Sequence, residues 1–135
     1  MEFDYEKERR EALDAGWEAL DRLRRARRCL DDAGTWGLFD IMGGGMFPTL
    51  IKHDHMNKAR QHLADAERAL RGFEKELRDL HSLANINLDT MDLLGLADIF
   101  CDGFFVDLLM QNRISEAQSR VDRAIRRVEE ILQTI

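Results

Sequence analysis

Proline is nearly absent from this chain, since Pro48 is the only one in 135 residues. Charged residues make up 34% of the sequence and hydrophobic residues 44%. A β-sandwich or a barrel requires many turns, whereas this composition is typical of long, solvated, amphipathic helices. We therefore expect an all-α fold in one domain that spans residues 1–135.

Cysteine is also scarce, and long apolar runs are missing. Cys29 and Cys101 lack metal-ligand spacing, which indicates buried thiols in a reducing compartment, although one disulfide between them stays open. The first residues, MEFDYEKERR, contain no apolar signal core, and no run reaches the roughly 18 apolar residues of a membrane span. These absences predict a cytoplasmic protein.

A basic excess and catalytic motifs are missing as well. The net charge of −6 argues against general affinity for nucleic acid. The sequence contains no phosphate loop, dinucleotide fingerprint, G-x-S-x-G elbow or H-E-x-x-H pair. We predict no catalytic residues and no cofactor.

One apolar stripe runs through segment 49–84 without interruption. Its members are Met56, Ala59, Leu63, Ala66, Leu70, Phe73, Leu77, Leu80 and Ala84. Spacings that alternate between three and four residues over four heptads predict a long helix, packed as in a coiled coil or a helix bundle.

Two further segments, 2–33 and 104–135, have similar stripes. Ile125 and Leu132 widen the stripe of the latter, so we expect that helix to contact more than one neighbour. The stripes consist of Leu13, Leu20, Leu23 and Leu30, edged by Ala12, Ala19, Ala26 and Ala33, and of Ile114, Ala117, Val121, Ala124, Val128, Ile131 and Ile135. The three helices together predict an elongated bundle.

Two apolar connectors repeat each other at an offset of 58 residues. GLFDIMGGGMFPTLI, which begins at Gly37, shares seven identities with GLADIFCDGFFVDLL, which begins at Gly95. The repeat, 36–70 and 94–128, predicts a unit used twice: a short apolar helix, a glycine turn and the start of a long helix. Breaks are expected near 34–36, 43–47, 85–89 and 102–103. The expected hinge residues are Gly43, Gly44, Gly45, Asp102 and Gly103, with Asp40 and Asp98.

Acids inside the connectors have two interpretations. Asp40 and Asp98 could do acid–base chemistry from an apolar setting, but their duplication favours a role in capping a helix end or a turn. The acids of the second connector could bind a divalent cation, although the spacing of a calcium loop is absent. They are Asp89, Asp92, Asp98, Asp102 and Asp107.

Histidines near the start of segment 49–84 are weak candidates for metal ligands. His53 and His55 point to different sides of a helix, and His62 is two turns from His55, so neither pair has chelating spacing. We interpret them as a polar flank. A transition-metal site completed by another chain is the alternative.

Five arginines lie within seven residues, RLRRARR. They are Arg22, Arg24, Arg25, Arg27 and Arg28. Such a cluster could bind phosphates, but no aromatic residue is interleaved to stack bases. We favour ion pairs with acids of the same helix or of segment 49–84. The latter are Asp65, Glu67, Glu74, Glu76 and Asp79.

Large aromatic residues in the connectors exceed what a 135-residue rod can bury. They are Trp36, Phe39, Phe47, Phe100, Phe104 and Phe105. Because a two-fold dimer is the commonest way to cover such apolar surface, we predict a homodimer that uses a connector and the wide face of segment 104–135, and that buries more than about 1,000 Å². Docking of another protein and association with a membrane surface are alternatives, and the acids of the second connector disfavour the membrane.

One motif resembles an uncharacterised bacterial family of helical proteins. The pattern reads W-G-x-x-D-x-x-G-G-G, then K-H, then a helix ending F-x-x-E-L-x-D. Its residues are Trp36, Gly37, Asp40, Gly43, Gly44, Gly45, Lys52, His53, Phe73, Glu76, Leu77 and Asp79. The resemblance covers about a third of the chain and implies a bacterial protein with no known activity. The sequence therefore predicts a non-enzymatic oligomerisation or protein-interaction module, with a small metal-binding protein or enzyme using the His53/His55 region as the alternative.

Overall fold

Three helices account for nearly all of the residues that the computed structural model of the chain describes. It describes the backbone of residues 2–43, 49–84 and 113–135, and the side chains of 4–32, 57–81 and 113–135. The helices are α1 (Glu2–Gly43), α2 (Thr49–Ala84) and α5 (Ile114–Thr134). Within the described ranges only Arg113 and Ile135 are not helical, so the prediction of an all-α fold is confirmed. None of the helices described is long and apolar enough to cross a membrane.

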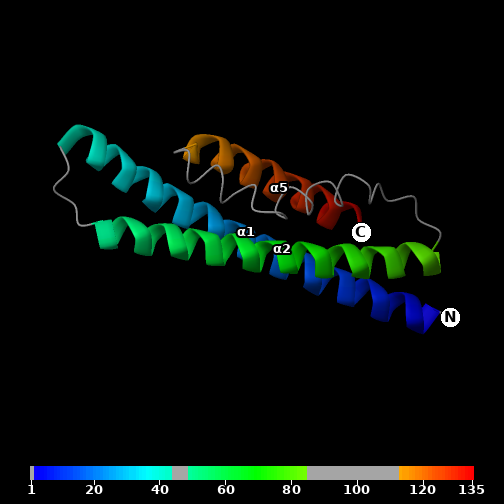
Figure 1. Cartoon of the computed structure of the whole chain (residues 1–135). Helices are drawn as coiled ribbons and strands as arrows, with labels where there is room; N and C mark the ends of the chain where they lie inside the picture. The colour runs from blue at the N-terminus through cyan, green and yellow to red at the C-terminus, as the bar shows by residue number, and fades with distance from the viewer. Residues whose placement is uncertain (1, 44–48, 85–112) are drawn as a thin grey trace.

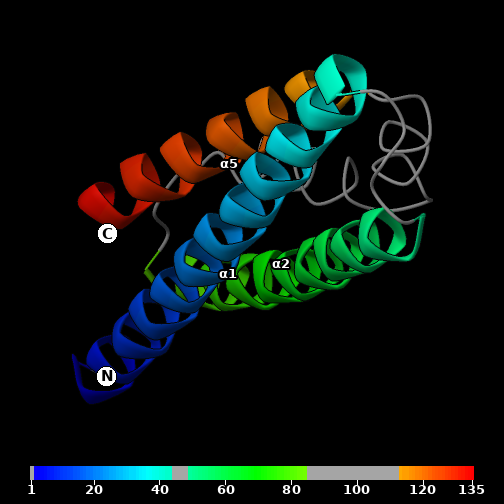
Figure 2. The same cartoon turned by 90° about the vertical axis from the view of Figure 1, so that its left-hand side faces the viewer.

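The first helix packs against both of the others (Figure 1). Arg22 of α1 pairs with Asp65 of α2, and Arg27 of α1 pairs with Asp122 of α5. Nearer the N-terminus, Arg9 donates a hydrogen bond to the backbone carbonyl of Ile135 at 2.8 Å. The last contact places the end of α5 beside the start of α1, so these two helices are antiparallel. Figure 2 shows how α1 runs along both partners at an angle.

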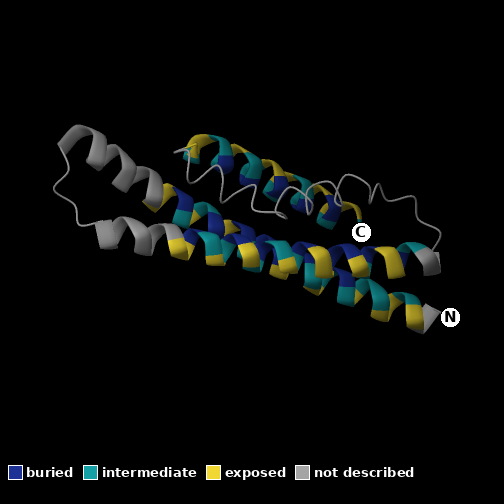
Figure 3. Cartoon of the chain, viewed as in Figure 1, coloured by how far each residue is buried: buried dark blue, intermediate teal, exposed yellow. Residues whose placement is uncertain are grey.

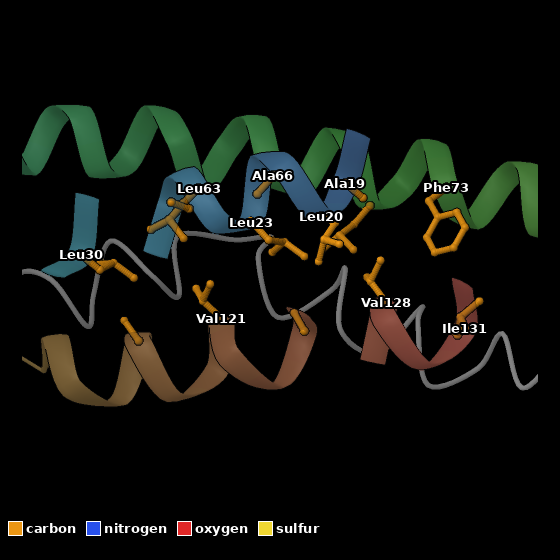
Figure 4. Close-up of a cluster of buried hydrophobic side chains, with 14 of the residues drawn as sticks. Ala19, Leu20, Leu23, Leu30, Leu63, Ala66, Phe73, Val121, Val128 and Ile131 are labelled. Carbon is orange, nitrogen blue, oxygen red and sulfur yellow. The ribbon is translucent and has the colours of Figure 1, made fainter. Parts of the chain in front are cut away.

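A continuous apolar core joins the three helices, because each presents its predicted stripe to the others (Figure 3). In Figure 4, Leu20 and Leu23 of α1 lie between stripe residues of α2 and of α5. The predicted stripe residues with described side chains are buried, except Leu13, Ile114 and Ile135, which are partly buried. Ile125 and Leu132, which widen the stripe of this helix, also pack on the core from partly buried positions.

Gly16 is the point at which side chains of the two other helices reach the backbone of α1. A methyl group placed on its Cα would lie 2.6 Å from Cδ2 of Leu132 and 2.9 Å from Cε1 of Phe73. Leu132 belongs to α5 and Phe73 to α2. These distances are shorter than van der Waals contact, so any larger residue at position 16 would require the side chains of Leu132 and Phe73 to shift.

The predicted break near 34–36 is wrong, since α1 continues without interruption to Gly43. Gly34 costs only about 1 kcal/mol within a helix, and a helix that is already formed propagates through weak helix formers such as Gly34 and Gly37. Asp40 therefore lies in the last turn of α1 instead of in a separate short helix. The end of α1 at Gly43 and the start of α2 at Thr49 agree with the predicted break at 43–47.

The third predicted helix, 104–135, also differs from the structure in where it begins. Arg113 is not helical, so the helix that contains the C-terminal stripe begins at Ile114. The counterpart of Arg113 in the repeat, His55, lies well inside α2, which means that the two copies differ there. Beyond this position Ala117 and Ala124 are buried like their counterparts Ala59 and Ala66. Residues 94–112 of the repeat lie outside the described residues, as do the breaks predicted near 85–89 and 102–103.

Candidate functional site

Carboxylates from α1 and α2 meet on one side of the bundle. One oxygen from each of Glu8, Glu76 and Asp79 lies within 4.8 Å of the other two. Glu76 and Asp79 are three residues apart, so both stand on the same face of α2. Glu8 belongs to α1, and the packing of α1 on α2 brings it to the other two acids. We call these three residues the acidic cluster.

Repulsion and burial act on the acidic cluster together. Burial raises the pKa of Glu8, and the nearby charges of Glu11 and Asp79 raise it further. The pKa of Glu76 is raised by burial first and then by Glu11, Asp79 and Glu8. One buried oxygen of Glu8 and one of Glu76 have no hydrogen-bond partner. Both side chains are therefore costly to keep ionised in the folded chain.

Two kinds of chemistry suit such a cluster. Carboxylate oxygens are the ligands that Ca²⁺ and Mg²⁺ prefer, and a carboxyl with a raised pKa binds a proton near neutral pH more readily than a free one. Glu8 and Glu76 are only partly buried, and Asp79 is exposed. The cluster is thus open to solvent on one side, and exposed acids of this kind are common in proteins without a metal.

Replacing Glu76 with glutamine is expected to raise the melting temperature at pH 7, by about 1–3 °C. The folded-state pKa of Glu76 lies above its ordinary value of 4.5, so its contribution to stability is fully present below that value and is lost as the pH rises through the folded-state pKa. The gain from the substitution should therefore shrink as the pH falls from 7 to about 4.5. Thermal unfolding at several pH values measures it.

Glu67 provides the matched control on the same helix. Its carboxylate forms an ion pair with Arg71 at 3.2 Å, so Glu67→Gln removes an attraction and should leave the melting temperature equal or lower. A melting temperature that falls at pH 7 for Glu76→Gln would show that the acidic cluster does not destabilise the fold.

The arginine cluster forms ion pairs within the chain. Arg22 pairs with Glu18 at 2.9 Å and reaches Asp65 of α2 at 4.0 Å. Arg25 pairs with Asp21 on its own helix at 3.1 Å. Pairs on the same helix and with α2 were both predicted. Arg22 and Arg25 thus both have an acidic neighbour, which supports the structural interpretation of the cluster.

The remaining pairs of the cluster reach α5, which was not predicted. Arg24 pairs with Glu129 at 3.5 Å. Arg27 donates a hydrogen bond from Nε to Asp122 at 2.8 Å, and its Nη1 pairs with Asp31 of α1. Gln118 of α5 donates to the same Asp31 carboxylate at 2.8 Å. Polar contacts therefore run along the edge of the α1–α5 interface and are compatible with one register of the two helices.

A double-mutant cycle on Arg27 and Asp122 is expected to give a coupling energy of about 1 kcal/mol. Their side chains are 28% and 43% exposed, so solvent screens the pair only in part. Urea unfolding of Arg27→Ala, Asp122→Ala, the double variant and the unchanged protein measures the coupling. The same cycle on Arg25 and Asp21, an exposed pair within one helix, should give about 0.3 kcal/mol. Equal couplings would mean that the pair across the helices stabilises the protein no more than an exposed pair within one helix does.

His62 is the histidine candidate with a described side chain, and it belongs to no group of three or more possible metal ligands in the described part of the chain. His53 and His55 lie on α2, where their side chains are outside the described residues. His62 is partly buried, and its Nδ1 is buried without a hydrogen-bond partner. The one grouping of ligand atoms found in the described part of the chain is the acidic cluster.

Most connector residues lie outside what the structure describes. Trp36 and Phe39 are on α1, but their side chains are not described. The others are Phe47, Phe100, Phe104 and Phe105, the hinge residues Gly44, Gly45, Asp98, Asp102 and Gly103, the acids Asp89, Asp92 and Asp107, and Cys101. Cys29 is partly buried against the core, and burial raises the pKa of its thiol.

Comparisons of the chain with known proteins found no matching family, no matching curated protein and no matching solved structure. The resemblance to a bacterial family of helical proteins therefore stays a prediction. Two acids of the acidic cluster, Glu76 and Asp79, belong to the motif quoted for it, and Phe73 of that motif lies in the core.

Proposed function

We propose that this chain is a non-enzymatic, cytoplasmic helical module that acts by binding protein, first of all a second copy of itself. Apolar side chains fill the core between the described helices. Among the described residues, Glu74 is the one charged residue that is buried. Glu74 forms an ion pair with Arg78 at 2.5 Å, and the side chain of Arg78 is 57% exposed. A bundle packed in this way supports a role carried by its outer surface.

The continuity of α1 is the observation that carries the proposal. Leu30 is fully buried on the stripe that faces the other helices. Phe39 follows nine residues later on the same helix, and at about 100° per residue this position is half a turn around α1 from Leu30. Trp36, six residues after Leu30, is about a third of a turn around the helix from Leu30. An uninterrupted helix thus sets large aromatic residues at positions outside the stripe.

Aromatic residues away from the internal stripe favour contact with a partner. Monomers seldom leave apolar patches of more than a few hundred Å² exposed, and a closed two-fold dimer covers the same patch on both copies. The net charge of −6 gives no support to a nucleic-acid partner. A second copy is therefore the partner that we propose, and a different protein docked on the same positions is the alternative.

Exchanging Phe39 for glutamate is expected to weaken self-association about 30-fold or more, because a buried aromatic anchor contributes about 2 kcal/mol or more to an interface. Trp17→Glu is the matched control. Trp17 is also an aromatic residue of α1 and is 56% exposed, but it stands 22 residues, or about 33 Å, along the helix from Phe39 and so beyond the proposed contact. Sedimentation equilibrium over a range of concentrations yields both dissociation constants. If both variants associate as tightly as the unchanged protein, the contact is not where we place it.

A further inference from the structure

We draw no further inference here: the strongest candidate, the acidic cluster of Glu8, Glu76 and Asp79 where α1 packs on α2, is a group of partly exposed carboxylates, and no second observation in the described part of the chain points to a ligand for it.

Discussion

Leucine at position 16 is expected to lower the free energy of unfolding by about 2–3 kcal/mol, and the melting temperature by about 10 °C. Even the first carbon of the new side chain would lie 2.6 Å from Leu132 and 2.9 Å from Phe73. The cost of relieving these overlaps outweighs the gain of less than about 1 kcal/mol in helix propensity that leucine brings in place of a helical glycine. Thermal and urea unfolding measure the change.

Gly72 makes a control that should move in the opposite direction. It is exposed on α2, and no atom lies within 4 Å of where its Cβ would stand. Gly72→Ala should therefore stabilise the protein by about 1 kcal/mol through helix propensity alone. Stabilisation by both Gly16→Leu and Gly72→Ala would contradict the close approach of the three helices at Gly16.

Truncation of Phe73 to alanine is expected to cost about 3–5 kcal/mol, since its ring is fully buried and its removal leaves a cavity. Phe73→Leu retains most of the apolar volume and should cost less than half as much. Urea unfolding, with the midpoint and the slope fitted separately, compares the two variants. A loss below about 1 kcal/mol for Phe73→Ala would mean that this ring does not pack in the core.

Gly16→Leu and Phe73→Ala should partly compensate each other. Removal of the Phe73 ring opens space beside Gly16, so the double variant Gly16→Leu, Phe73→Ala should be less destabilised than the sum of its parts, by about 1 kcal/mol or more. Simple additivity would indicate that the two residues are not in contact.

The helices could be predicted from the sequence because their signal is local. Spacings of three and four residues place Ala59 to Leu80 on one face of α2, and burial in the structure follows that pattern residue by residue. The extension of α1 past Gly34 was not predicted, because a glycine followed by threonine is weak evidence for a helix end and equally compatible with continuation.

The contacts between helices could not be predicted in the same way, because they depend on register. Glu8 and Glu76 are distant in sequence, and only the alignment of α1 with α2 brings them together. The partners of Arg24 and Arg27 on α5 were missed for the same reason. A partial signal did exist for the junction at Gly16. It lies between Ala12 and Ala19 in the row of small residues along the stripe, and such a row permits close helix approach.

Self-association is the central claim, and the mass of the protein in solution tests it most directly. Light scattering after size exclusion should be carried out on the unchanged chain at a series of concentrations in the micromolar range. The mass should be twice the 15.7 kDa of one chain. The mass should fall toward that of one chain only on strong dilution, as mass action requires. A mass of 15.7 kDa at every concentration would contradict the homodimer.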